Sequence, residues 1–244
     1  MNNIIVTVCS PVHNEEENLA ELISRMTEAM ETDYSGRWEY LLVDDCSTDN
    51  SLQLLEEAAG KNPALKVLSH DRNRGERAAW LTGFRAARGE VVATLAADLQ
   101  SQPEAVPKLI DVILKNGFDV GTAQRKNRQD KKFYLVASFF LTIYARVIFN
   151  TKVKDVSSSF FAARSFLLKD LKLIGNDHRY IIPILKRRGA KISEIPIPHM
   201  ARTKGKSHYT YLKVLKAIPE LAYFTFRYFN KYYDLSNSTN NREL

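Results

Sequence analysis

Short apolar runs alternate with longer helical patterns along the first half of the chain, and this alternation limits the possible folds more than any other feature. Strands are expected near 4–10, 38–45, 65–69, 90–96 and 118–123, and helices near 15–31, 49–60, 75–87 and 103–116. The strand-like runs are rich in Val, Ile and Leu. The sequence therefore predicts an α/β fold whose mostly parallel central sheet is flanked by helices on both faces.

Polar clusters follow four of the expected strands. They read SPVHNEEEN, DDCSTDNS, DRNRGER and ADLQ after the first, second, third and fourth strand. Taken singly, they are explained by strand ends and helix caps, with Ser47 or Asp49 capping one helix and Asn14 or Glu15 opening another. In open α/β sheets, however, ligands bind outside the carboxyl ends of the strands. Four such loops on one edge of a sheet favour a single binding site.

Length and charge limit the classes of function. The chain has 244 residues, of which 45% are hydrophobic, and this is enough for one large core. Its 35 Lys and Arg against 28 Asp and Glu give a net charge of +7, which suits nucleic acid, anionic lipid or a phosphorylated substrate. The basic residues gather late in the chain without a recognisable nucleic-acid-binding motif. We therefore expect no nucleic-acid partner.

The start of the chain and its cysteines indicate a cytoplasmic location. No apolar run reaches the roughly 20 residues that span a bilayer, and the first residues lack the basic flank and cleavage site of a signal peptide. Cys9 and Cys46 lie in apolar runs and are expected to be buried thiols in a reducing compartment. The polar residues 234–244 are expected to form a disordered tail.

Eight motifs follow one another over nearly the whole chain. They are PVHNEEENL (11–19), LLVDDCSTDNS (41–51), NRGERAAWLTGF (73–84), AADLQSQPEAVPKLI (96–110), DVGTAQR (119–125), KDVSSSFFAARSFLL (154–168), RRGAKISEIPIPH (187–199) and RTKGKSHY (202–209). Together they resemble the family 2 glycosyltransferases, and among these the polyprenyl-phosphate group that includes dolichyl-phosphate mannose synthase. The resemblance implies a GT-A fold over residues 1–209, followed by an amphipathic aromatic and basic helix over 210–233.

The resemblance also implies where a nucleotide sugar would bind. In the family, the base and ribose are held by positions that correspond here to Pro11, His13, Glu15, Val43 and Asp45, and Ala97 also corresponds to a donor-binding position. A carboxylate at a strand end accepts hydrogen bonds from an imino group or a ribose hydroxyl. These residues do not distinguish uracil from guanine, so both UDP-linked and GDP-linked donors stay open.

The end of the fourth strand departs from the family pattern. The family usually has DADLQ there, and its two carboxylates and glutamine oxygen hold a divalent cation; this chain has AADLQ, with Ala96 in the first position. Asp98 and Gln100 remain as metal ligands for Mg²⁺ or Mn²⁺, which prefer such oxygen ligands. We expect the metal to bind more weakly and to depend on the donor. A metal-independent or inactive site is the alternative.

Positive charge at the site would compensate for a weaker metal. The resemblance makes Arg125 and Arg202 candidate phosphate ligands, since cations stabilise the charge that develops on a leaving diphosphate. Lys204, Ser207 and His208 lie in a loop that closes over the donor in the family, where His208 replaces the usual lysine. Asp155 is expected to position the acceptor or the donor sugar.

These implications describe an inverting glycosyltransferase that moves a sugar from a nucleotide donor to undecaprenyl or dolichyl phosphate. A phosphate monoester, with a second pKa near ~6, is largely dianionic at neutral pH and attacks without a catalytic base. Two alternatives stay open. One is a family 2 enzyme that acts on a hydroxyl of a glycan or lipid-linked saccharide, and the other is a catalytically silent sugar-nucleotide-binding protein, which Ala96 suggests.

Two segments favour a position on the membrane. Apolar residues from Phe133 to Ile148 fall at helical spacing, and residues 211–233 interleave Lys and Arg with Tyr and Phe. Aromatic and basic side chains together suit the headgroup region of an anionic leaflet. We therefore expect a peripheral protein on the inner face of the cytoplasmic membrane. An interface between copies of the chain, and thus a homo-oligomer, is the alternative for the same surface.

Overall fold

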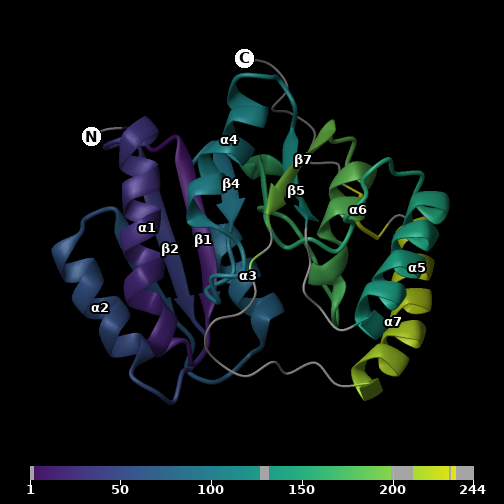
Figure 1. The fold of residues 1–244 in the computed structure, drawn as a ribbon, viewed down its shortest axis with the longest axis horizontal. Coiled ribbons are helices and arrows are strands. Elements are labelled where there is room, and N and C mark those ends of the chain that lie inside the picture. The colour runs from purple at the N-terminus through teal and green to yellow at the C-terminus, as the bar shows by residue number, and fades with distance from the viewer. Residues whose placement is uncertain (1–2, 127–131, 199, 201–210, 231, 235–244) are drawn as a thin grey trace.

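The computed structural model describes residues 3–126, 132–198, 200, 211–230 and 232–234, which form one seven-stranded sheet with helices on both faces (Figure 1). The strands are β1 Val6–Val12, β2 Trp38–Asp44, β3 Leu65–Ser69, β4 Val91–Thr94, β5 Val120–Lys126, β6 Phe161–Arg164 and β7 Ile192–Pro198. The α-helices are α1 Glu16–Tyr34, α2 Ser51–Lys61, α3 Glu76–Ala86, α4 Val106–Leu114, α5 Lys132–Ile148, α6 Ile181–Arg187 and α7 Tyr211–Phe229. Three short 3-10 helices are η1 Pro103–Ala105, η2 Ser165–Leu167 and η3 Asp177–Tyr180.

The sheet has the strand order β3-β2-β1-β4-β6-β5-β7. All neighbouring pairs are parallel except those of β6, which runs antiparallel to both β4 and β5. The predicted mostly parallel sheet is confirmed. The carboxyl ends of the other six strands therefore lie at one edge of the sheet, together with the amino end of β6; in Figure 1, β1 and β2 point to this edge.

Side chains of the central strands alternate between two cores. Val6 and Val8 of β1 face the core that α1, α2 and α4 cover, whereas Cys9 faces the core that α3, α5, α6 and α7 cover. The side chains of β2 alternate in the same way: Tyr40 faces the core under α1, α2 and α4, and Leu41 faces the core under α3, α5, α6 and α7. The alternation is the one expected of strands buried on both faces. The chain therefore forms a three-layer α/β/α structure.

α3 packs unusually close to β1. A Cβ atom at Gly83 would lie 2.0 Å from the Sγ atom of Cys9, so only glycine allows this approach. The N-cap residue of the same helix is Gly75, whose φ of +84° is a conformation that favours glycine. These two glycines fix both the start of α3 and its distance from the sheet.

Several elements differ from the sequence-based expectation. The antiparallel strand β6, the edge strand β7 and helix α6 were not among the expected elements, because short runs after residue 123 lack a clear period. Of the two cysteines, Cys9 is a buried thiol as expected, but Cys46 is only half-buried. It lies in the loop after β2, with a φ of +58°, and not in the strand itself.

α5 and α7 lie side by side on the face of the sheet that carries α3 (Figure 1). The hydroxyls of Tyr144 and Thr225 are 2.9 Å apart across the pair. Phe149, just after α5, contacts the rings of Phe224 and Tyr228 on α7. The C-terminal helix is thus packed into the second core. None of the described helices combines the length and the apolarity that crossing a bilayer requires.

Candidate functional site

The loops that follow β1 and β2 are joined to each other at the carboxyl edge of the sheet. The main-chain N–H of Asn14 donates to the hydroxyl of Ser47 at 3.0 Å, and the N–H of Thr48 donates to the side-chain oxygen of Asn14 at 2.7 Å. The N–H of Glu16 donates to Asp49 at 3.2 Å. Asp49 therefore caps α1, the helix of the other loop, and much of the acidity of the two loops serves to hold them together.

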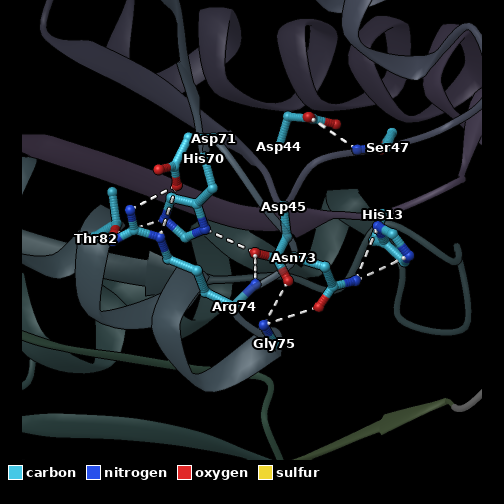
Figure 2. A network of polar contacts seen from close by, with 10 residues as sticks. All are labelled: His13, Asp44, Asp45, Ser47, His70, Asp71, Asn73, Arg74, Gly75 and Thr82. Carbon is cyan, nitrogen blue, oxygen red and sulfur yellow. Dashed lines mark hydrogen bonds and ion pairs between the residues drawn. The ribbon is translucent and has the colours of Figure 1, made fainter.

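Asp45 is the centre of the polar network that Figure 2 shows. Its Oδ1 atom lies 2.7 Å from Nδ1 of His70 and accepts the main-chain N–H of Arg74 at 2.8 Å, and its Oδ2 atom accepts the N–H of Gly75 at 2.7 Å. Burial raises the pKa of Asp45, but the hydrogen bonds from His70 and the two main-chain groups outweigh burial, so the pKa lies below its ordinary value. Asp45 is therefore an anion that organises the loop after β3.

The same loop meets the predicted donor residue His13. The side-chain amide of Asn73 lies 3.1 Å from Nε2 of His13, and both side chains are exposed (Figure 2). Asn73 also accepts the N–H of Gly75 at 3.1 Å. The structure thus brings together His13 and Asp45, which the sequence places 32 positions apart, through the segment 70–75.

Asp98 and Gln100 lie just beyond β4. Leu99 between them has a φ of +57°, and the N–H of Gln100 donates to the carboxylate of Asp98 at 3.2 Å. The carbonyl of Gln100 accepts the N–H of Met200 at 3.0 Å. Within the described residues, no three His, Cys, Asp or Glu side chains gather closely enough to enclose a metal ion. The available donors are one carboxylate and one amide oxygen, which fit a cation shared with a substrate phosphate.

Arg125 and Asp155 form a bidentate ion pair. Nε and Nη2 of Arg125 donate to the two carboxylate oxygens of Asp155 at 2.6 and 2.8 Å. Asp155 is held in turn by Glu194 on β7, which accepts the N–H of Asp155 at 2.8 Å and that of Lys154 at 3.0 Å. Because β6 is antiparallel, the segment that precedes it reaches the carboxyl edge, and this orientation delivers Asp155 to the end of β5.

The other predicted site residues are less accessible or lie outside the described residues. The side chains of Val43 and Ala97 are buried in the two cores, so that only their main chains are available to a ligand. Pro11 is half-buried in β1, and Glu15 accepts the side-chain amide of Asn18 at 2.6 Å. Four predicted residues of the 201–210 segment lie outside the described residues: Arg202, Lys204, Ser207 and His208.

Sequence analysis missed three side chains that the structure places at this edge. Asn73 and Glu194 stood only within quoted motifs and were given no role, and His70, directly before the polar cluster after the third strand, was in none of them. A polar residue at the end of a strand-like run was the available signal for His70. The roles of all three depend on partners 25 to 60 positions away along the chain, as in the pairs His70 with Asp45 and Asn73 with His13.

Comparisons with known proteins identify the family and the fold. The sequence model of the family Glycosyl transferase family 2 matches residues 7–172. The chain is 36% identical over 220 residues to the undecaprenyl-phosphate 4-deoxy-4-formamido-L-arabinose transferase of Pseudomonas fluorescens (strain SBW25), covering 88% of this chain and 63% of the relative. It is 30% identical over 230 residues to the dodecaprenyl-phosphate galacturonate synthase of Rhizobium johnstonii, covering 91% and 66%. The chain thus spans slightly less than two thirds of these curated relatives.

A solved structure shows the same fold. Glucosyl-3-phosphoglycerate synthase from Mycobacterium tuberculosis, in complex with Mn²⁺, uridine diphosphate and glucosyl-3-phosphoglycerate, superposes with a TM-score of 0.69 at 19% identity. The match covers 92% of this chain and 79% of that protein. The predicted GT-A fold is confirmed.

Proposed function

Because the chain belongs to glycosyl transferase family 2, we propose that it transfers a sugar from a UDP-linked or GDP-linked donor to a polyprenyl phosphate, with inversion at the anomeric carbon. The observation that supports the proposal is that His13, Asp45, Asp98 and Arg125 lie at or just beyond the carboxyl ends of β1, β2, β4 and β5, which are at one edge of the sheet. The names of the two curated relatives, both polyprenyl-phosphate transferases, support the choice of acceptor.

The chemistry requires one displacement. A phosphate oxygen of the acceptor attacks the anomeric carbon, the bond from that carbon to the diphosphate breaks, and the nucleoside diphosphate leaves with the electron pair. The acceptor phosphate needs no base because its second pKa, near ~6, leaves it ionised at neutral pH. The protein then has to align the two reactants and stabilise the negative charge of the leaving group. In the proposal the guanidinium of Arg125 supplies the positive charge that stabilises the leaving group, and Asp155 fixes the plane of that guanidinium.

A divalent cation fits the proposal through Asp98 and Gln100. Mg²⁺ sites commonly use one or two carboxylates together with substrate phosphates. The cation would supply a Lewis acid that neutralises the diphosphate. With Ala96 in place of a second carboxylate, this chain holds such a cation mainly when the donor is present.

A binding and turnover panel tests the function. The wild-type chain is heated with UDP-sugars and GDP-sugars, with and without Mn²⁺. Each donor is then incubated with the chain and either undecaprenyl phosphate or a saccharide acceptor. A donor at about 100 times its Kd adds about 2.7 kcal/mol of stability, which raises Tm by about 5–10 °C in a chain of this length. One nucleotide sugar should give this shift and a lipid-linked product whose anomeric configuration is inverted.

Other outcomes of the panel contradict the proposal in distinct ways. A shift in Tm without transfer to undecaprenyl phosphate favours the silent sugar-nucleotide-binding protein, and transfer to a saccharide hydroxyl favours the second enzyme class.

A separate experiment tests the metal site by comparing the Mn²⁺ affinity of Ala96→Asp with that of Ala96→Asn, which adds an oxygen without charge. The aspartate should tighten Mn²⁺ binding in the presence of donor by about tenfold, or about 1.4 kcal/mol. Equal Mn²⁺ affinities in both variants and the wild type would mean that the metal lies elsewhere.

We also propose that the chain rests on the cytoplasmic face of the membrane through α5 and α7. The two helices expose large apolar side chains: Phe139, Phe140, Ile143 and Val147 on α5, and Tyr223, Phe226 and Phe229 on α7. Arg146 and Lys152 are exposed near the end of α5. An apolar surface beside basic side chains suits an anionic leaflet, which also carries the proposed acceptor.

Flotation with vesicles of phosphatidylglycerol and phosphatidylcholine tests the membrane proposal. The wild type should rise with the vesicles, and Phe140→Glu/Phe226→Glu should stay at the bottom, because both side chains are 64% exposed and would place charge in the apolar layer. Leu114→Glu is the matched control, since Leu114 is exposed on α4 at the opposite face of the sheet. A wild type that stays at the bottom but sediments as a dimer would favour an interface between two copies instead.

A further inference from the structure

His70 occupies a fixed position between β3 and α3. Its main-chain N–H donates to the carbonyl of Asp44 at 2.9 Å, so the backbone continues the pairing of β3 with β2 beyond the end of the strand. The His70 side chain is only 7% exposed. Substitution of the ring therefore leaves the main chain anchored, and the effect of the ring can be measured separately.

The His70 ring connects Asp45 to α3 (Figure 2). Nδ1 lies 2.7 Å from Oδ1 of Asp45, and Nε2 lies 3.0 Å from the hydroxyl of Thr82. In a neutral imidazole one nitrogen donates and the other accepts. The tautomer with hydrogen on Nδ1 donates to the carboxylate and accepts from the hydroxyl, so it satisfies both contacts. Thr82 is itself held in place because the neighbouring Gly83 packs directly on Cys9.

The contacts of Asp45 leave room for one more donor. A carboxylate has about four acceptor directions, and the described contacts fill two on Oδ1, from His70 and Arg74, and one on Oδ2, from Gly75. The Asp45 side chain is 4% exposed, which excludes a full hydration shell. The remaining direction on Oδ2 therefore suits a single N–H group of a ligand.

We propose that His70 is a positioning residue for the donor, which holds the Asp45 carboxylate so that its remaining acceptor direction meets an N–H group of the nucleotide base. This inference rests on the proposed function, because it presumes that a nucleotide binds at this edge. Without the His70 ring, the carboxylate keeps only the main-chain N–H of Arg74 on Oδ1 and that of Gly75 on Oδ2, so its orientation is less restrained. The loop that carries Asn73 toward His13 would move with it.

Three substitutions of His70 distinguish the contribution of Nδ1 from that of Nε2. His70→Asn places an amide N–H where Nδ1 stands, His70→Gln places one near Nε2, and His70→Leu removes both. Titration calorimetry with UDP and with GDP, each with Mn²⁺, gives the Kd of whichever nucleotide the wild type binds. We expect the asparagine variant to bind within about threefold of the wild type, and the glutamine and leucine variants to bind at least about tenfold more weakly, a difference of about 1.4 kcal/mol.

A stability control and a spectroscopic measurement complete the test. Tyr34→Phe removes a hydrogen bond of 3.2 Å to Asp111 at the far side of α1, and it should lower Tm without changing the nucleotide Kd. The ¹⁵N spectrum of the wild type should show hydrogen on Nδ1 of His70, and this signal should move when nucleotide is added. Equal Kd values for the leucine variant and the wild type, or equal losses for asparagine and leucine, would overturn the inference alone. A wild type that binds neither nucleotide would overturn the proposed function as well.

Discussion

Arg125→Ala is expected to lower the turnover number for sugar transfer by about 10²–10³-fold, the size of loss seen when one preorganised group that stabilises a developing negative charge is removed. The reason is geometric. Asp155 takes two N–H groups of Arg125 at 2.6 and 2.8 Å and fixes the guanidinium at the carboxyl edge of the sheet. The measurement is kcat and KM with undecaprenyl phosphate and the nucleotide sugar that the wild type uses.

Two controls distinguish loss of charge from loss of structure. Arg125→Lys keeps the charge but cannot form the bidentate ion pair with Asp155. This variant should therefore retain more activity than Arg125→Ala and less than the wild type. Urea unfolding of each variant is needed, since removing Arg125 leaves Asp155, which is 7% exposed, without its cation. A folded alanine variant whose kcat stays within about threefold of the wild type, less than 1 kcal/mol of barrier, would exclude Arg125 from the proposed role.

Asp177→Ala is expected to reduce the free energy of unfolding by about 3–5 kcal/mol, because it leaves a buried charge without its partner. Asp177, at the start of η3, pairs with Arg227 of α7 and accepts the hydroxyl of Tyr233 at 2.6 Å. It also accepts the N–H of Ile174 at 2.8 Å. Burial and the bond to Asp177 raise the pKa of Tyr233 above its ordinary value, so Tyr233 remains a neutral donor. Urea denaturation measures the loss.

The matched control for Asp177 is a surface ion pair. Glu90→Ala breaks the 2.6 Å pair with Arg164, which is more exposed, and it should cost less than about 1 kcal/mol. If Asp177→Ala does not fold, the double substitution Asp177→Leu/Arg227→Met should restore a folded chain, since an apolar pair avoids the cost of burying charge. Equal losses for Asp177→Ala and Glu90→Ala would show that the buried network contributes little to stability.

The sequence predicted the first five strands and four helices because each carries its own local pattern. In α1, for example, Leu19, Leu22, Met26 and Met30 repeat at helical spacing and all are fully buried. β6 has only four residues, Phe161–Arg164, and its place between β4 and β5 depends on pairing with segments about 40 and 70 positions earlier. Such pairing leaves no periodic signal, and neither does the reversed direction of the strand.

The candidate site was predictable as a set of loops but not as a set of contacts. The resemblance to a family supplied Asp45, Arg125 and Asp155 as separate residues. It did not indicate that Arg125 and Asp155 bind each other. Nor did it indicate that the Asp45 carboxylate makes three hydrogen bonds within the protein, to His70, Arg74 and Gly75. These contacts join segments 25 to 30 positions apart through the folded sheet, so they become visible only when the strands are in register.

The reversed direction of β6 has a consequence for protein engineering. Residues 149–160 link α5 to the start of this strand and reach the carboxyl edge before a strand, whereas the described loops after β1, β2, β3 and β4 leave that edge after one. Exchanging the exposed residues of this linker for those of a relative, with Phe149, Asp155 and the strands kept, would change the surface beside Asp155 while the hydrogen-bonded ladder keeps its alignment. Under the proposed function, these positions are the ones to exchange in order to change which lipid phosphate is accepted.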